Sequence, residues 1–111
     1  MIQPSTISFV DKKKQEEYYN LFLGTSEEKT LLKLLNKKLD ELKRDASAGK
    51  QVRRSHIPKQ YREFDNLWKI DLNSRWRLLY SIVSDEQGRI TVIIDWLDHK
   101  EYEKLLGYHV K

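Results

Sequence analysis

The chain has 111 residues, of which 39% are hydrophobic and 34% charged, so it can fill one hydrophobic core but is too short for two. It has no cysteine, which excludes disulfide bonds, thiolate metal sites and a thiol nucleophile, and which fits a reducing cytoplasm. No stretch approaches the ~20 apolar residues that cross a bilayer, and no secretion signal is recognisable. We therefore expect a single cytoplasmic domain over residues 1–111 that is neither exported nor membrane-spanning.

The net charge of +4 comes mainly from one segment. Residues 1–49 hold nine Lys or Arg against eight Asp or Glu, whereas residues 50–62 hold five Lys or Arg, one His and no acid. Such a segment suits a polyanionic partner such as nucleic acid. The alternative is a solvated loop that binds nothing.

The N-terminal part of the chain predicts a strand that leads into a helix. Residues 7–10 form a short β-prone run. Residues 12–23 are mostly helix formers, and Tyr18, Leu21 and Phe22 are grouped along one side of the predicted helix.

A second, longer helix has clear start and stop signals. Thr25 and Glu28 form a capping box, in which the Thr25 hydroxyl accepts from the Glu28 N–H while the Glu28 side chain reaches back. Until Gly49 supplies a stop, apolar residues recur at three- and four-residue intervals: Leu31, Leu35, Leu39, Leu42 and Ala46. The spacing predicts one long amphipathic helix.

After the basic segment the hydrophobic period changes to two. Trp68, Ile70 and Leu72 alternate with Lys69 and Asp71, which predicts a strand with one buried and one polar face.

Two turn signals, at residues 73–74 and 85–88, divide the chain that follows. They separate β-prone runs over residues 76–83 and 90–96. We expect these runs and the preceding strand to form an antiparallel meander.

Asp98 can cap a short final helix, which carries Tyr102, Leu105 and Leu106 towards the sheet. The predicted order is βααβββα, an α+β fold with a small, twisted, mainly antiparallel sheet. Two N-terminal helices are expected on one face of the sheet, together with a short C-terminal helix. The other face is expected to be concave and polar, and to carry the functional site.

Three stretches carry a family resemblance: residues 67–72 (LWKIDL), 76–80 (WRLLY) and 93–99 (IIDWLDH), with Tyr102 beyond them. Over residues 67–102 the chain resembles the RelE/ParE superfamily of toxins. Members carry a Tyr/His/Trp-Arg-Leu-hydrophobic-Tyr strand, preceded by a strand with basic residues and followed by one that ends near His or Arg. The resemblance implies a RelE-like fold and a ribosome-dependent mRNA endoribonuclease that inhibits translation. In that reaction the RNA 2′-hydroxyl attacks the adjacent phosphate, and no metal or cofactor is needed.

The resemblance also implies catalytic roles. Arg77 occupies the signature arginine position, where its planar fork would stabilise charge on the scissile phosphate; the alternative is an ion pair with a carboxylate such as Asp71. Lys69 should share the Arg77 face and bind phosphate, or it is simply an exposed lysine that keeps the sheet soluble. Asp71 departs from the family pattern, because ribosome-dependent members often have a basic residue there. It is an auxiliary base, a holder of Arg77 or a sign of weakened catalysis.

The C-terminal segment supplies three further candidates. His99 matches a position at which some family members carry a catalytic histidine, so it is the candidate general base; the alternative is a structural or solvated histidine. Tyr102 and Tyr108 are candidate proton donors or base-stacking rings, since family members often place a tyrosine there. Either tyrosine could instead pack the last helix.

The basic segment is the candidate surface for contacts with the mRNA or rRNA backbone. Tyr61 lies within it and could stack on a base, and the residues that we expect to contact RNA are Arg53, Arg54, His56, Lys59 and Arg62.

The resemblance implies partners as well: mRNA on the ribosome, rRNA, and a cognate antitoxin that forms a toxin–antitoxin hetero-oligomer with the chain. We expect no membrane partner. The alternatives are a non-catalytic, ParE-like inhibitor of DNA gyrase and a degenerate RNA-binding module. Arg77 with His99 favours the nuclease, and Asp71 is the main feature against it.

Overall fold

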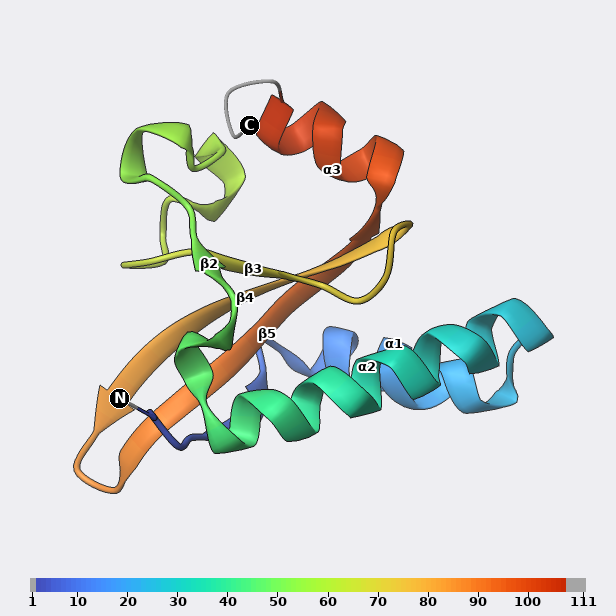
Figure 1. Ribbon diagram of the computed structural model, residues 1–111, viewed down its shortest axis with the longest axis horizontal. Helices are drawn as coiled ribbons and strands as arrows, with labels where there is room; N and C mark the ends of the chain where they lie inside the picture. The colour runs from blue at the N-terminus through green and yellow to red at the C-terminus, as the bar shows by residue number, and fades with distance from the viewer. Residues whose placement is uncertain (1, 108–111) are drawn as a thin grey trace.

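The computed structural model describes residues 2–107, which form three α-helices and one five-stranded sheet (Figure 1). The strands are β1 (Thr6–Phe9), β2 (Lys50–Gln51), β3 (Trp68–Asp71), β4 (Trp76–Asp85) and β5 (Gly88–Asp98). The helices are α1 (Lys12–Asn20), α2 (Ser26–Arg44) and α3 (His99–Leu106). The predicted α+β class is confirmed, although the observed order contains a strand, β2, that was not predicted. Within residues 2–107, no helix is long and apolar enough to cross a membrane.

The sheet is mixed, with the strand order β1-β5-β4-β3-β2. The pair β1 and β5 is parallel, and the other neighbouring strands are antiparallel. A bulge interrupts the long β4–β5 pair, because Leu79 lies opposite Asp95 while the next residue, Tyr80, lies opposite Ile93. Ile94 is therefore an extra residue in β5, and it shifts the alternation of the strand before the chain enters α3.

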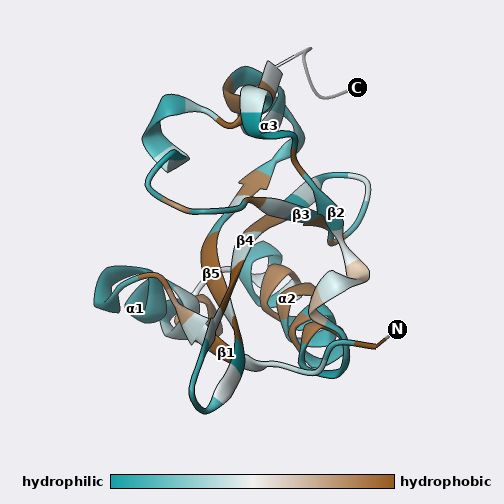
Figure 2. Ribbon diagram, turned by 90° about the vertical axis from the view of Figure 1, so that its left-hand side faces the viewer, coloured by the Kyte–Doolittle hydropathy of each residue, from teal (hydrophilic) through white to brown (hydrophobic). Residues whose placement is uncertain are grey.

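Helix α2 covers one face of the sheet. The predicted capping box is confirmed, with Glu28 N–H 3.2 Å from Thr25 Oγ1 and Thr25 N–H 3.1 Å from Glu28 Oε1. The hydrophobic side of the helix turns towards the strands (Figure 2), and its four buried leucines are Leu31, Leu35, Leu39 and Leu42. They pack against buried residues of β3, β4 and β5, and each buried leucine stabilises the fold by about 1.5–3 kcal/mol.

Helix α1 contributes less to this core than expected, since none of its own residues is buried. It ends at Asn20 and continues as a 3₁₀ turn over Leu21–Leu23, in which the tighter winding buries Leu21 and leaves Phe22 68% exposed. The prediction that Phe22 lies on the same side as Leu21 is therefore wrong. An ion pair of 2.8 Å between Lys14 and Asp95 ties α1 to β5.

The opposite face of the sheet has a second core, which was not predicted. The chain between β2 and β3 folds over this face in two 3₁₀ turns, Arg54–His56 and Lys59–Tyr61, and α3 lies beside it (Figure 1). The buried residues of this second core are Val52, Ile57, Tyr61, Leu67, Leu79, Ile94, Leu97, Tyr102 and Leu106. The expectation that this face is polar is therefore wrong for much of its area, because these residues bury it. Because Tyr61 is buried there, it is not available to stack on a base.

The connection between α2 and β2 depends on Tyr80. Helix α2 ends at Arg44, earlier than the predicted stop at Gly49. Gly49 is needed for another reason: a Cβ there would lie 2.3 Å from the Lys69 carbonyl oxygen and 2.6 Å from the Tyr80 hydroxyl. That buried hydroxyl donates to the Ala46 carbonyl at 2.9 Å and accepts from the Gly49 N–H at 3.1 Å.

We predict that Tyr80→Phe lowers the free energy of unfolding by about 1–3 kcal/mol, because it leaves the carbonyl of Ala46 and the N–H of Gly49 without their partner. Urea denaturation of the parent and the variant measures the loss. Tyr19→Phe is the matched control, since Tyr19 is 60% exposed and its change should be nearly neutral. Equal midpoints for Tyr80→Phe and the parent would contradict the prediction.

Candidate active site

The register of β3 and β4 brings three of the candidate residues onto one face of the sheet. Asp71 lies directly opposite Arg77, and Lys69 lies opposite Leu79. Because side chains alternate along a strand, these residues face away from α2, while Ile70 and the Leu78 opposite it belong to the core under that helix. The predicted shared face of Lys69 and Arg77 is confirmed.

The Arg77 side chain is held in place by its neighbours and is only 15% exposed. Its Nε lies 3.0 Å from Asp71 Oδ1, and its Nη1 donates to the Ser74 carbonyl at 3.3 Å. A guanidinium has five N–H groups, so these contacts leave donors for a further anion. The ion pair that was the alternative interpretation of Arg77 is thus present, and Asp71 is placed to orient the guanidinium.

His99 is the first residue of α3, directly after the capping residue Asp98. Its Nδ1 lies 3.5 Å from Arg77 Nη2, and its Nε2 lies 2.9 Å from Glu103 Oε1. A neutral imidazole that donates from Nε2 to Glu103 has its lone pair at Nδ1, where it accepts the hydrogen bond from Arg77 Nη2. The lone pair of a candidate base and a candidate phosphate-binding group are therefore neighbours.

Glu103 was not singled out from the sequence, although a signal was present. Residues four apart on a helix are neighbours on its surface, and the predicted cap at Asp98 placed His99 and Glu103 at that spacing. Lys50 was counted in the basic segment but was not singled out as a site residue. It lies opposite Lys69 in the two-residue strand β2, at a hollow of about 170 Å³ that Lys50, Lys69 and Asp71 help to line.

Tyr102 lies beneath the two basic side chains. The centre of its ring is 5.6 Å from Arg77 Cζ and 5.2 Å from Lys69 Nζ, which is the geometry of cation–π contacts. Its hydroxyl is buried and has no hydrogen-bond partner among the described residues. Burial raises the pKa of the Tyr102 hydroxyl to about 12, with Arg77 opposing and Asp71 reinforcing that rise. These facts favour the interpretation that Tyr102 packs the last helix over that of a proton donor or stacking ring.

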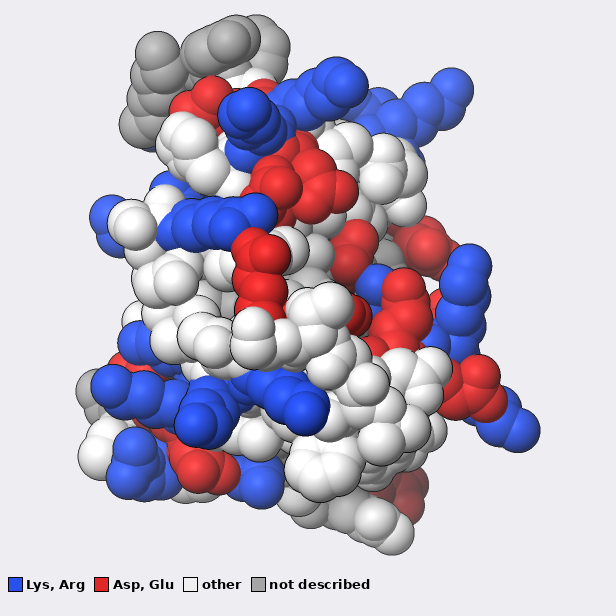
Figure 3. Space-filling view, turned by 90° about the vertical axis from the view of Figure 1, so that its right-hand side faces the viewer, with Lys and Arg blue, Asp and Glu red and all other residues white. Residues whose placement is uncertain are grey.

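The structure thus brings together the five candidate catalytic residues: Lys69, Asp71, Arg77, His99 and Tyr102. The side of the molecule that includes the β3–β4 turn and the start of α3 carries acidic and basic side chains interspersed (Figure 3). Within residues 2–107, no group of three or more His, Asp or Glu is arranged to hold a metal ion.

The candidate RNA-binding residues lie in the segment between β2 and β3 that packs over the second core. Arg53, Arg54, Lys59 and Arg62 are exposed, and His56 is partly buried. Tyr108 lies outside the described residues.

Comparisons of the chain with protein-family models, with curated proteins and with solved structures find no match. The resemblance to the RelE/ParE superfamily therefore depends on the residues of the chain itself.

We predict that Tyr102→Phe leaves the stability at neutral pH unchanged or slightly higher, because the hydroxyl that it removes is buried without a partner. The folded-state pKa of Tyr102, about 12, is above its usual value of about 10. Because the unfolded chain loses the Tyr102 proton near pH ~10 and the folded chain only near pH ~12, this group lowers the stability of the parent as the pH rises through that range. Urea denaturation between these pH values should show a smaller loss for Tyr102→Phe than for the parent. Identical pH dependence would contradict the assigned burial.

Proposed function

We propose that this protein is a metal-independent mRNA endoribonuclease with a RelE-like fold, acting on the ribosome as the toxin of a toxin–antitoxin pair. One observation carries the proposal: the Arg77 guanidinium lies among the carboxylate of Asp71, the Nδ1 of His99 and the ring of Tyr102. These groups come from separate stretches of the chain. Arg77, His99 and Tyr102 lie at positions that carry the family resemblance, whereas Asp71 departs from the family pattern.

In the proposed reaction, His99 Nδ1 takes the proton of the RNA 2′-hydroxyl, whose oxygen then forms a bond to the adjacent phosphorus. The remaining N–H groups of Arg77 bind the phosphate oxygens as negative charge builds up on them. The bond from phosphorus to the 5′-oxygen breaks, and in this proposal the Lys69 ammonium gives that oxygen a proton. The products are a 2′,3′-cyclic phosphate and a 5′-hydroxyl end.

Two carboxylates act on the catalytic groups in this proposal without contacting RNA. Asp71 fixes the plane of the Arg77 guanidinium through the contact at Nε. Glu103 accepts from His99 Nε2 and thereby keeps the proton-free nitrogen directed at Arg77. Both are positioning residues.

The proposed partners follow from the charge of the site. Messenger RNA and rRNA supply phosphates for Arg77, Lys69 and the basic segment. A cognate antitoxin would block the site by covering these cations, and an acidic segment would suit them. Because such a toxin acts on translating ribosomes, we propose a cytoplasmic location and no membrane partner.

A second candidate function is favoured by the ion pair of Arg77 with Asp71. At a separation of 3.0 Å, the carboxylate competes with a phosphate for the guanidinium. If Asp71 keeps the Arg77 guanidinium from binding a phosphate, the protein would bind its target without cleaving RNA. It would then be a gyrase inhibitor of the ParE type or a degenerate RNA-binding module.

We predict that Arg77→Ala and His99→Ala each abolish or severely reduce mRNA cleavage in a ribosome-dependent assay. Removing one preorganised donor to the transition state costs about 10²–10³-fold, and removing a positioned base costs about 10²–10⁴-fold. Arg77→Lys should recover only part of the loss, and His99→Gln none, because an amide cannot accept the proton.

The matched control for these variants is Arg75→Ala, since Arg75 lies two residues from Arg77, is 58% exposed and pairs with Glu27 instead. It should keep the parental cleavage rate. Thermal melts must accompany every variant, because activity lost through unfolding says nothing about chemistry. Folded Arg77→Ala and His99→Ala proteins that cleave at the parental rate would refute the assigned roles.

We predict that Asp71→Ala lowers cleavage, because the Arg77 guanidinium loses the contact that orients it. The same assay measures the rate, and Asp85→Ala is a control for the loss of one strand carboxylate away from the site. A rate above that of the parent would instead show that Asp71 restrains Arg77. A variant that cleaves, beside a parent that does not, would support the non-catalytic candidate.

A further inference from the structure

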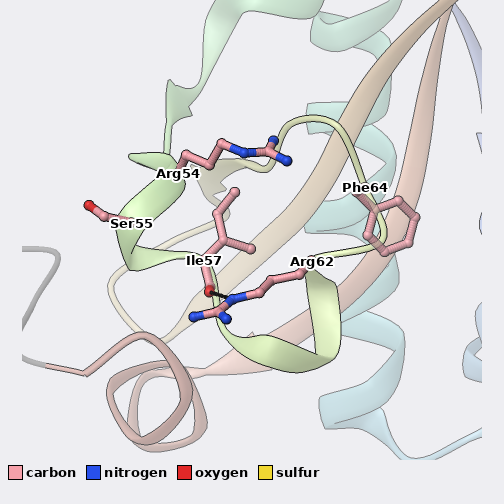
Figure 4. Close-up of a pocket in the computed structure, with 5 residues that line it drawn as sticks. All are labelled: Arg54, Ser55, Ile57, Arg62 and Phe64. Atoms are coloured by element: carbon pink, nitrogen blue, oxygen red, sulfur yellow. Dashed lines mark hydrogen bonds between the residues drawn. The ribbon is translucent and has the colours of Figure 1, made fainter.

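A pocket of about 300 Å³ lies in the segment between β2 and β3, and it contains none of the proposed catalytic residues. The residues that line it are Arg54, Ser55, Ile57, Arg62 and Phe64. Arg54 and Arg62 lie on opposite sides of Ile57, and Phe64 stands at one end (Figure 4). Both guanidinium groups are fixed at one atom, because Arg54 Nη1 donates to the Asp65 carbonyl at 2.9 Å and Arg62 Nε donates to the Ile57 carbonyl at 3.3 Å.

The lining combines two kinds of chemistry. Arg54 and Arg62 retain further N–H groups for an anion, since each of the two hydrogen bonds uses only one donor of a guanidinium. No carboxylate side chain is among the lining residues to compete for them. Phe64, which is partly exposed, provides the apolar part of the lining and packs on the second core, to which the buried Ile57 belongs. A fitting ligand therefore has a flat apolar part joined to an anion.

A nucleotide is such a ligand. Its base can stack on an aromatic ring or on a guanidinium plane, and its phosphate matches the arginine fork. Ligand pockets usually measure about 300–1,000 Å³, so this one suits a single nucleotide. The surrounding residues 50–62 carry five Lys or Arg and no acid, which suits the repeated charge of an RNA backbone.

We propose that this pocket binds one unpaired nucleotide of single-stranded RNA, with the base against Phe64 and the phosphate on Arg62 and Arg54. The inference rests on the proposed function, for which it names a contact with RNA outside the catalytic cluster. It also assigns different roles within the basic segment. Arg62 and Arg54 bind the phosphate of the nucleotide, whereas Lys59 is not a lining residue and contributes only positive charge near the pocket.

The test measures fluorescence anisotropy with two labelled probes. One is a short single-stranded 2′-O-methyl RNA, which lacks the free 2′-hydroxyl and cannot be cleaved by the proposed reaction. The other has the same number of phosphates but abasic sugars. Stacking of one base on an aromatic side chain should make the parent bind the first probe about fivefold or more tightly than the second.

Two variants and one control separate the pocket from its surrounding charge. Phe64→Leu keeps an apolar residue against the second core but removes the ring, so the preference for the base-containing probe should disappear. Arg62→Lys keeps the charge but removes the fork, so both probes should bind more weakly. Lys59→Ala removes a charge from the same segment and should weaken both probes less than Arg62→Lys, with the preference unchanged.

Three results would overturn the inference: equal binding of both probes by the parent, an unchanged preference in folded Phe64→Leu, or a larger loss in Lys59→Ala than in Arg62→Lys. Because neither probe can be cleaved, the outcome is independent of catalysis. Ribosome-dependent cleavage without a base preference would support the proposed function and refute nucleotide binding in the pocket. A base preference without cleavage would support nucleotide binding in the pocket and refute the proposed endoribonuclease function.

Discussion

The register of the β3–β4 hairpin, which sets Asp71 opposite Arg77, is the constraint on which the rest of the site depends. A slip of one residue would turn Arg77 into the core under α2 and expose the apolar residues that now fill it. The register is held by those apolar residues, since Ile70, Leu78 and Tyr80 are buried against the leucines of α2. Packing on one face of the sheet therefore fixes the charged groups on the other.

The second core performs the corresponding task for α3. Tyr102 and Leu106 anchor the helix on the sheet, so the first turn of α3 lies beside the start of β4, where Trp76 is opposite Asp98. The capping box between Asp98 and Glu101 starts the helix at His99. Since Tyr102 belongs both to this core and to the cluster around Arg77, the placement of the imidazole is coupled to the burial of an aromatic ring.

Local patterns in the sequence predicted most of the elements, because period-two alternation and capping boxes act over a few residues. The resemblance singled out Arg77 and His99, and the alternation placed Lys69 and Arg77 on one face. Features set by long-range contacts were missed. Strand β2 is two residues long, which is too short to show an alternation of apolar and polar residues. The second core brings Val52 together with residues of α3 that are about fifty positions later in the chain. Tyr61 was misjudged for the same reason: its burial depends on residues distant in the chain.

The chemistry of the RNA ends left by the protein tests the central claim most directly. Messenger RNA from translating ribosomes treated with the purified parent should carry new 3′ ends with a 2′,3′-cyclic phosphate, or the 3′-phosphate formed by its hydrolysis, and new 5′ ends with a free hydroxyl. These ends result when the neighbouring 2′-hydroxyl is the nucleophile. New 3′-hydroxyl and 5′-phosphate ends would show attack by water, and the absence of new ends would show no cleavage. Either result would contradict the account.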